Sequence, residues 1–244
     1  MSRLQGKTAV VTGGGSGIGL GAAKRFIDEG AFVYIFGRRQ DVLDAALAKL
    51  GPHARAVSGS VTDPADLDRL YETVKAERGQ LDILFANAGT GSFAGLGEIT
   101  PEHYDQIFDV NVKGLIFTVQ KALPLMKAGS SIILTGSSTG VMGTQRFSIY
   151  SATKAAIRNL ARSWALDLRG TGIRVNVLSP GPTKTELALE VLGEDAMDAL
   201  GATTPLGRMG DPTETGAVAA FLASSDSSFM TGGEVFVDGG LAQI

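Results

Sequence analysis

Short apolar segments alternate along the chain with longer segments in which apolar residues recur at helical spacing. The short segments are apolar on both faces, a pattern typical of strands that helices cover on both sides. They predict strands at Thr8–Thr12, Phe32–Phe36, Ala54–Ser58, Ile83–Ala86, Ser131–Thr135, Ile173–Leu178 and Glu234–Val237. The longer segments predict amphipathic helices at Gly17–Glu29, Arg39–Lys49, Pro64–Arg78, Pro101–Lys127, Ser148–Arg169 and Pro212–Ser224.

The alternation of strands and helices predicts an α/β fold with a doubly wound parallel sheet and helices on both faces. A length of 244 residues suits one large domain, so we expect residues 1–244 to form a single domain. The least regular stretch is residues 182–211, which follow a predicted strand. Because parallel sheets bind ligands at the carboxyl ends of their strands, we expect a substrate-binding loop there, although a variable surface loop would look the same.

The composition excludes several functions. With 22 basic and 25 acidic residues the formal charge is −3, which argues against a nucleic-acid-binding protein. The absence of cysteine excludes disulfides and thiolate chemistry, and His53 and His103 have no ligand-like neighbours, so we expect no metal site. The polar N-terminus does not resemble a signal peptide, and its first apolar run is far too short to cross a bilayer. We therefore expect a cytoplasmic protein that does not enter the membrane.

A glycine-rich turn follows the first predicted strand directly and opens the first predicted helix. Residues 12–19 read Thr-Gly-Gly-Gly-Ser-Gly-Ile-Gly, and glycines let a backbone turn sharply and approach a pyrophosphate closely. The N-terminus of the following helix adds N–H groups and the positive end of its dipole. The turn therefore predicts a dinucleotide-binding site formed by Gly13, Gly15, Ser16, Gly17, Ile18 and Gly19.

The end of the second predicted strand bears on which dinucleotide is bound. An NAD enzyme places an acidic residue there to accept hydrogen bonds from the 2′-hydroxyl of the ribose. Here Gly37 occupies that position and Arg38 and Arg39 follow, and a guanidinium can form a charge-assisted contact with the 2′-phosphate of NADP. We therefore predict NADP(H) rather than NAD(H). The alternative is that one or both arginines only solvate the start of a helix.

Tyr150 and Lys154 lie four residues apart, so they share one face of a predicted helix. A phenol has a pKa near ~10, and a nearby ammonium group lowers that pKa, so Tyr150 could transfer a proton at neutral pH. Ser137 follows a strand that ends at the same edge of the sheet, where its hydroxyl could bond a substrate oxygen or simply stabilise a turn. Asn111 lies within a predicted helix, where asparagine is unfavourable, and a bound water that links Lys154 to solvent is one explanation.

In this order and at this spacing, the motifs resemble those of the short-chain dehydrogenase/reductase family over nearly the whole chain. The resemblance extends to Asp63, the Asn-Ala-Gly sequence at residues 87–89, the Pro-Gly pair at 180–181 and the Val-Asp-Gly-Gly sequence at 237–240. It implies a Rossmann-type fold, a homotetramer and a catalytic tetrad of Asn111, Ser137, Tyr150 and Lys154. It also implies NADP(H) contacts from Val61, Asp63, Asn87, Ala88, Gly89, Tyr150, Lys154, Pro180, Gly181, Thr183 and Thr185.

The resemblance further implies transfer of the pro-S hydride of NADPH to a carbonyl carbon, with Tyr150 as the proton donor and Ser137 stabilising the oxygen. Lys154 would tune Tyr150, and a relay through Asn111 would return the proton. Within the family, residues 84–87 and 108–120 are most similar to bacterial NADPH-dependent secondary-alcohol dehydrogenases, which reduce ketones. We expect substrate contacts from Ser137, Thr139, Gln145 and Tyr150, with a pocket wall completed by Thr90, Gly91, Ser92, Val141 and the loop after Pro182.

Two alternatives stay open. A 3-oxoacyl-[acyl carrier protein] reductase would share the tetrad and need a basic patch for its acidic carrier protein, for which Lys121, Lys127 and Arg169 are scattered candidates. A non-catalytic NADP(H)-binding regulator would not need to keep Ser137 and Tyr150.

Two positions depart from the family pattern, and the C-terminal tail suggests an assembly. Ala86 stands where the family often has asparagine, and we expect it to change only local hydrogen bonding. Thr183 stands where valine or isoleucine is common, and we expect cofactor contacts to stay intact if they come from the backbone. The tail from Gly232 to Ile244 is apolar, which predicts burial against a partner subunit or, alternatively, against its own chain.

Overall fold

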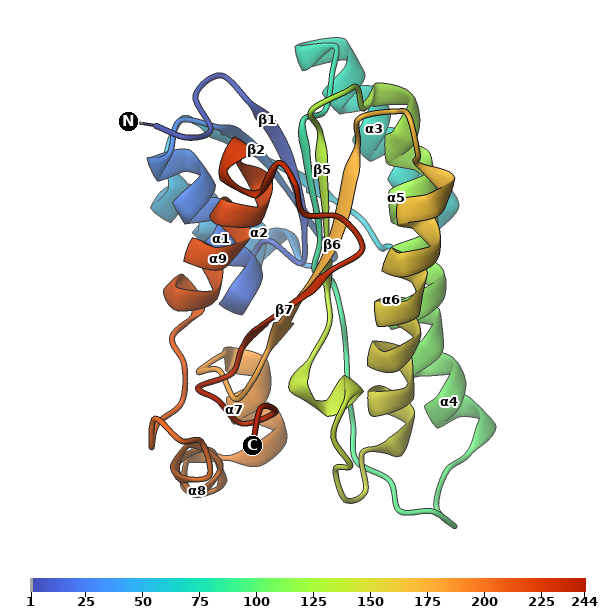
Figure 1. Ribbon diagram of the computed structural model, residues 1–244, viewed down its shortest axis with the longest axis vertical. Coiled ribbons are helices and arrows are strands. Elements are labelled where there is room, and N and C mark those ends of the chain that lie inside the picture. Colours follow the sequence, from blue (N-terminus) through green and yellow to red (C-terminus); the bar gives the residue numbers. More distant parts are fainter. Residues whose placement is uncertain (1) are drawn as a thin grey trace.

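Seven parallel strands form the centre of the molecule in the computed structural model, which describes residues 2–244 (Figure 1). In spatial order they are β3 (Ala54–Ser58), β2 (Phe32–Gly37), β1 (Thr8–Thr12), β4 (Ile83–Ala86), β5 (Ser131–Thr135), β6 (Arg174–Pro180) and β7 (Glu234–Val237). The strand order reverses between β1 and β4, and in sheets of this kind the crevice at the reversal binds ligands at the carboxyl ends of the strands.

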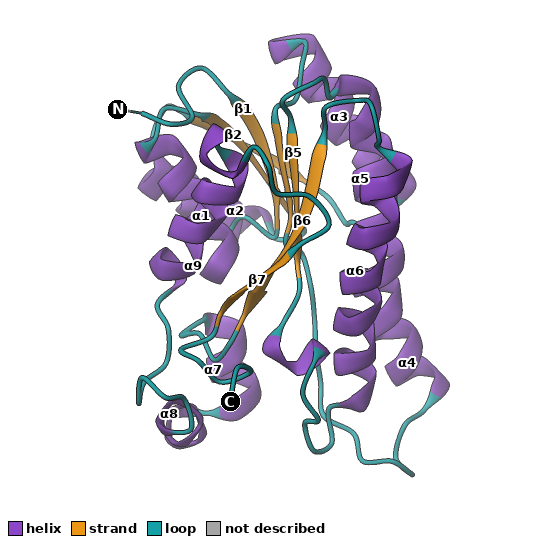
Figure 2. Cartoon of the chain, in the orientation of Figure 1, coloured by secondary structure: helices purple, strands orange, loops and turns teal. Residues whose placement is uncertain are grey.

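Helices cover both faces of the sheet, so the predicted doubly wound, Rossmann-type fold is confirmed (Figure 2). One face carries α1 (Gly17–Asp28), α2 (Gln40–Leu50) and α9 (Pro212–Ala223), and the other carries α3 (Pro64–Arg78), α5 (Leu115–Ala122) and α6 (Ser148–Asp167). Successive strand residues enter opposite cores: Val10 packs with α3, α5 and α6, whereas Val11 packs with α1, α2 and α9. This alternation explains why the central strands are apolar on both faces.

The two edge strands are less buried than predicted for strands that helices cover on both faces. β3 and β7 are largely half-buried, because each has a neighbouring strand on one side only. The predicted strand at Ile173–Leu178 lies at 174–180, a shift of one or two residues at its ends.

Two predicted segments have a different internal structure. The segment Pro101–Lys127 is not one helix: α4 (Pro101–Phe108) passes into a π-helical turn at Asp109–Gly114, then α5, and then a 3₁₀ turn at Leu123–Leu125 that contains Pro124. The stretch 182–211 holds two short helices, α7 (Glu186–Leu192) and α8 (Glu194–Ala202), separated by Gly193 with a φ of 77°. Helices this short give little periodicity to detect in the sequence.

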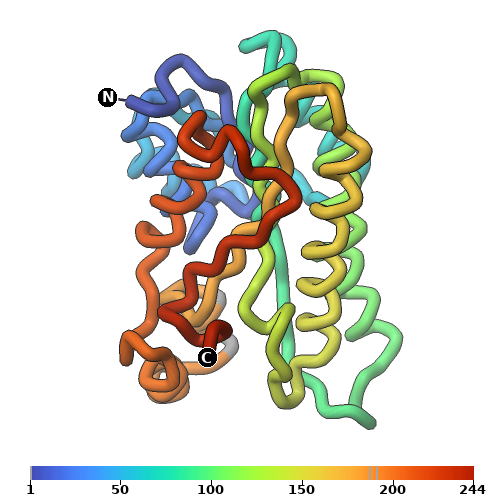
Figure 3. Tube along the Cα trace, in the orientation of Figure 1, coloured from blue at the N-terminus to red at the C-terminus, as the bar shows by residue number. Residues whose placement is uncertain are grey.

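The C-terminal tail makes contacts within its own chain. β7 runs beside β6, and the chain ends a few residues after this strand (Figure 3). The N–H of Leu206 donates to the carbonyl of Gly239 at 3.3 Å, and the carboxylate of Asp238 accepts the N–H groups of Gly240 and Ala242 at 2.9 and 2.8 Å.

Candidate active site

The four predicted tetrad residues meet at the carboxyl edge of the sheet. Ser137 follows β5 by two residues, Tyr150 and Lys154 lie in the first turns of α6, and Asn111 lies in the π-helical turn. Ser137, Lys154 and Asn111 are buried, and Tyr150 is half-buried. The sequence prediction that these side chains converge therefore agrees with their placement.

Asn111 holds the loop that follows β4. Its side-chain oxygen accepts the N–H of Thr90 at 2.8 Å, and its Nδ2 donates to the carbonyl of Thr90 at 2.9 Å and to Oγ1 of Thr153 at 3.1 Å. The unfavourable position of an asparagine inside a helix is thus matched by three hydrogen bonds to protein partners and by a π turn.

Burial shifts the pKa values of both Lys154 and Tyr150. The ammonium of Lys154 donates to the carbonyl of Thr135 at 2.9 Å and lies 5.3 Å from the centroid of the Tyr150 ring. Burial lowers the pKa of Lys154 to about 8. Burial also raises the pKa of Tyr150, and a hydrogen bond with Ser137 acts in the opposite direction. The expected lowering of the Tyr150 pKa by Lys154 is not found: desolvation of the phenolate dominates, and the one opposing contribution comes from Ser137.

Ser137 is oriented by Thr139, one of the predicted substrate contacts. Oγ of Ser137 lies 3.0 Å from Oγ1 of Thr139 and accepts its N–H at 3.3 Å, so Thr139 belongs to the hydrogen-bond network of the tetrad. Gln145 and Val141, also predicted to face the substrate, are exposed on the loop before α6.

The glycine turn fits a dinucleotide pyrophosphate. A Cβ on Gly19 would lie 2.2 Å from the carbonyl oxygen of Gly13, so no side chain fits there, and Gly17 has a φ of 49°, a conformation that favours glycine. Ser16 is the first residue before α1 and its side chain does not cap the helix, while Ile18 packs into the core. A backbone this tightly wound at a helix N-terminus is the cradle that a phosphate requires.

Residues that follow β4 hold the glycine turn in place, and the predicted substrate loop contacts it. Asn87 donates from Nδ2 to the carbonyl of Thr12 at 3.1 Å, and the N–H of Ala88 donates to Oγ1 of Thr12 at 3.0 Å. Glu186 in the first turn of α7 accepts the N–H of Gly17 at 3.2 Å, so a carboxylate oxygen already lies where the helix terminus attracts anions. No sequence pattern indicated Glu186, because the contact joins residues 169 positions apart.

The remaining predicted cofactor residues surround this turn. Gly37 ends β2, and Arg38 and Arg39 are exposed; within residues 2–244 no carboxylate pairs with either arginine. Asp63 is exposed and caps α3 by accepting the N–H of Ala65 at 2.9 Å.

Other predicted cofactor residues line the same carboxyl edge. Gly89 lies beside Asn111 and Lys154, Val61 is buried against Gly114, and Gly15 lies beside Val42. After β6, the N–H of Gly181, which follows Pro180, donates to Val237 at 3.0 Å, and Thr183 donates to the carbonyl of Gly181 at 3.0 Å. Thr185 caps α7 and lies against Gly17.

The sequence missed an aromatic group beside Tyr150. The ring of Phe147 stacks on that of Tyr150 at a centroid distance of 4.4 Å, and the ring of Phe93 lies 4.5 Å from that of Phe147. The spacing of Phe147 and Tyr150, three residues apart, was the available signal, since residues at that spacing are neighbours on a helix.

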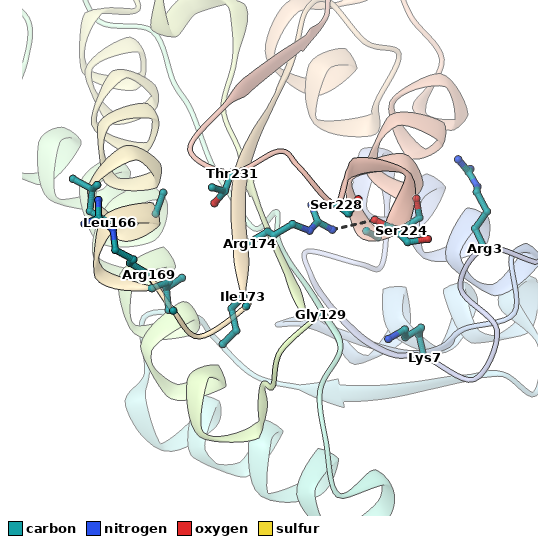
Figure 4. Close-up of a pocket in the computed structure, with 16 residues that line it drawn as sticks. Arg3, Lys7, Gly129, Leu166, Arg169, Ile173, Arg174, Ser224, Ser228 and Thr231 are labelled. Carbon is teal, nitrogen blue, oxygen red and sulfur yellow. Dashed lines mark hydrogen bonds between the residues drawn. The ribbon is translucent and has the colours of Figure 1, made fainter.

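The larger of the two described cavities lies elsewhere. It has a volume of about 810 Å³ and opens at the amino edge of the sheet, lined by Arg3, Lys7, Leu166, Ile173, Arg174 and Thr231 among others (Figure 4). Arg174 points to the end of α9, where its guanidinium donates to the carbonyls of Leu222 and Ser224 at 2.9 and 3.1 Å. We assign the chemistry to the opposite edge, because the tetrad lies there.

No helix within residues 2–244 combines the length and apolar character needed to cross a membrane. In the same part of the chain, no cluster of three or more histidine or acidic side chains is arranged to hold a metal ion.

A glycine turn at a helix N-terminus and a serine–tyrosine–lysine group at the same edge of a parallel sheet define a nicotinamide-dependent oxidoreductase as the class that fits this geometry. The comparisons give the family. Residues 13–242 match the family described as enoyl-(acyl carrier protein) reductase. The chain belongs to the short-chain dehydrogenase/reductase family, as the motifs had indicated.

Similar proteins share almost the full length of the chain. "Oxidoreductase asL5" of Sarocladium schorii is 66% identical over 100% of this chain and 99% of its own. An NADP-dependent (R)-specific alcohol dehydrogenase of Lentilactobacillus kefiri is 36% identical over 98% of this chain and 97% of its own. The structure of a 3-ketoacyl-(acyl-carrier-protein) reductase from Brucella melitensis, complexed with NADH, has a TM-score of 0.91 and 31% identity, covering 98% of this chain and 99% of that one.

Proposed function

We propose that this oxidoreductase transfers a hydride between NADP(H) and a ketone or secondary alcohol, with Tyr150 as the general acid and base. The observation that carries the proposal is the convergence of Tyr150, Ser137 and Lys154 at one edge of the sheet, beside a glycine turn that fits a pyrophosphate. NADP(H), when bound, supplies or accepts the hydride at its nicotinamide ring.

Each side chain of the tetrad has its own role in proton transfer and charge stabilisation. Tyr150 donates its proton to the carbonyl oxygen as that oxygen gains charge, and Ser137, oriented by Thr139, donates a hydrogen bond to the same oxygen. Lys154, buried and bonded to Thr135, supplies positive charge near the ring. We assign the return of the proton to a path from Lys154 past Asn111, which also fixes the loop at Thr90. Alcohol oxidation uses the same groups in reverse.

The choice of NADP(H) over NAD(H) rests on the end of β2. Gly37 places no acid near the expected 2′-hydroxyl, and the exposed guanidinium groups of Arg38 and Arg39 can reach a 2′-phosphate. The similarity to an NADP-dependent alcohol dehydrogenase supports this choice, whereas the similarity to a reductase complexed with NADH does not distinguish the two cofactors. We retain the expectation of a cytoplasmic homotetramer with a substrate-binding loop at 182–211.

The second candidate is reduction of a 3-oxoacyl carrier thioester, which the likeness to the Brucella enzyme favours. Such an enzyme needs free basic groups for an acidic carrier. Lys121 pairs with Asp68, so one of the three basic candidates is already engaged by an acid. We therefore rank ketones first.

A screen of NADPH oxidation against ketones, aldehydes, sugars and acyl thioesters tests the proposal. We expect the highest kcat/KM for neutral ketones. A higher value for a 3-oxoacyl carrier thioester would reverse the ranking. Tight NADPH binding without turnover of any carbonyl compound would instead favour a non-catalytic regulator.

A further inference from the structure

One buried hydroxyl joins two members of the predicted tetrad. Thr153 lies on α6 between Tyr150 and Lys154 and is fully buried. Its hydroxyl donates to the backbone carbonyl of Tyr150 at 2.6 Å and accepts a hydrogen bond from Nδ2 of Asn111 at 3.1 Å. A threonine inside a helix often bonds the carbonyl three or four residues earlier, so the first bond alone would be ordinary. The second bond makes the hydroxyl a link between the π-helical turn and the helix that carries Tyr150.

The amide of Asn111 fits its neighbours in one orientation only. Its Oδ1 accepts the N–H of Thr90 at 2.8 Å, and its Nδ2 donates to the carbonyl of Thr90 at 2.9 Å. Turning the amide over would place oxygen against oxygen and nitrogen against nitrogen, because a backbone N–H only donates and a carbonyl only accepts. The second hydrogen of Nδ2 therefore goes to Thr153, whose own hydroxyl hydrogen goes to the carbonyl of Tyr150.

The loop after β4 connects the same hydrogen bonds to the ring of Tyr150. A Cβ on Gly91 would lie 2.9 Å from Cδ2 of Tyr150, so the loop backbone lies against the edge of the ring. The residue before it, Thr90, is held at both backbone groups by Asn111. Tyr150 is thus fixed at two points, because Thr153 bonds its backbone carbonyl and the loop that Asn111 holds lies against its ring.

The interior position of these bonds makes the loss of any one of them costly. The side chains of Asn111 and Thr153 are both fully buried. A buried polar group that loses its partner has no water to replace it, and neighbouring hydrogen bonds in such a network strengthen one another. Without the hydroxyl of Thr153, one hydrogen of the Asn111 amide would lose its acceptor, and the amide would no longer be tied to α6.

We propose that Thr153 is a positioning residue, whose hydroxyl couples the amide of Asn111 to the backbone of Tyr150 and so fixes where the phenol lies relative to Ser137. The inference rests on the proposed ketone reduction and adds a residue to its site. Because Thr153 is fully buried, it acts through Asn111 and Tyr150 rather than on the substrate. Proton donation requires the phenol within hydrogen-bond reach of the carbonyl oxygen, so a small displacement of Tyr150 slows the reaction.

The test replaces the hydroxyl by a methyl group in a side chain of the same shape. Thr153→Val removes both bonds and should lower kcat for ketone reduction roughly 10- to 100-fold, as a displacement of about 1 Å can, with KM for NADPH unchanged. Thr153→Ser keeps the hydroxyl on a less restricted side chain and should stay within about threefold of the unaltered protein. Turnover is expressed per NADPH-binding site, counted by fluorescence titration, so that unfolded protein does not enter the comparison.

A kinetic isotope effect separates positioning from stability. Displacement of the phenol slows the chemical step, and that step then limits turnover more fully. Deuterium at the transferred position of NADPH should therefore reduce kcat by a larger factor in Thr153→Val than in the unaltered protein. A purely structural role would lower the unfolding temperature and leave the isotope effect unchanged, and that result would contradict the proposal.

Thr118→Val is the matched control, because Thr118 is a fully buried threonine on α5 whose hydroxyl has no hydrogen-bond partner in the part of the chain that the structure describes. It should leave kcat and the isotope effect unchanged. Thr153→Ala removes the same hydroxyl from a smaller side chain and carries the test should Thr153→Val not fold.

Two results would overturn the role of the Thr153 hydroxyl while leaving ketone reduction intact. One is an unchanged kcat per binding site in Thr153→Val or Thr153→Ala. The other is an equal loss in Thr153→Ser and Thr153→Val, which would assign the effect to packing. Failure of the unaltered protein to reduce any carbonyl compound would instead overturn the proposed function itself.

Discussion

Both edges of the sheet hold cationic side chains, but those at the amino edge are half-buried, whereas the one at the carboxyl edge is buried. At the amino edge, Arg174 donates to the carbonyls that end α9, and Lys7 pairs with Asp82 at 3.2 Å. At the carboxyl edge, Lys154 is buried, donates to one carbonyl and lies over the ring of Tyr150. The larger cavity lies at the amino edge. Cavity volume alone would favour the amino edge, whereas the buried Lys154 beside Tyr150 favours the carboxyl edge, where we propose that the reaction takes place.

Among the variants at the two edges, Tyr150→Phe at the carboxyl edge is expected to cause the largest loss of activity. Without the phenol hydroxyl, no group donates the proton to the carbonyl oxygen, so kcat for ketone reduction should fall roughly 10²- to 10⁴-fold. NADPH binding, measured by fluorescence titration, should change little because the ring remains. Near-normal turnover would refute the role of Tyr150.

Lys154→Met should change how stability depends on pH in the cofactor-free protein. Burial lowers the pKa of Lys154 from 10.5 to about 8, so between these values the unfolded chain binds more protons than the folded one. The free energy of unfolding should therefore rise with pH across this window, by about 3 kcal/mol more in the unaltered protein than in the variant. Denaturant unfolding at pH 7 and pH 10 measures the difference, and parallel curves would show that Lys154 is not desolvated.

Arg38→Ala should weaken the preference for NADPH over NADH. A charge-assisted bond to the 2′-phosphate contributes about 1.5–3 kcal/mol, so the ratio of the two kcat/KM values should fall roughly 10- to 100-fold. Arg39→Ala serves as the comparison, since Arg39 directly precedes α2 and its side chain makes no capping bond there. Unchanged preference in both variants would assign the two arginines to solvation of the helix start.

Arg174→Met tests the structural assignment of the amino edge. Losing its bonds leaves the carbonyls of Leu222 and Ser224 without this partner, which should cost about 1–3 kcal/mol of unfolding free energy. Turnover at saturating substrate should not change. A loss of turnover with normal stability would mean that this edge also takes part in function.

The smallest effect is expected from Glu186→Gln. The carboxylate of Glu186 bonds the N–H of Gly17 in the glycine turn and should repel a nearby pyrophosphate. Removing its charge should tighten NADPH binding by about two- to fivefold, as expected for an exposed charge. Glu190→Gln, on the same helix α7, is the control. Weaker binding by Glu186→Gln would show that the carboxylate helps to position the cofactor loop.

Local patterns predicted the central strands and the convergence of the tetrad, because Tyr150 and Lys154 share a helix turn and parallel strands end at a common edge. They did not predict the π turn around Asn111, since an amphipathic pattern continues across it almost unchanged. The pairing of Arg146 with Glu98 spans 48 residues, and that of Glu186 with Gly17 spans 169. Such contacts depend on how loops meet in three dimensions, and no spacing along the chain encodes them.

The central claim is direct hydride transfer to a carbonyl carbon, and isotope transfer tests it most directly. NADPH carrying deuterium at the pro-S position of C4 is incubated with the protein and the best ketone from the screen, and the alcohol is analysed by mass spectrometry and NMR. We predict one deuterium on the carbinol carbon of each alcohol formed. Alcohol without deuterium would place the reacting hydrogen elsewhere on the cofactor, and consumption of NADPH without alcohol would contradict the assignment of this site to carbonyl reduction.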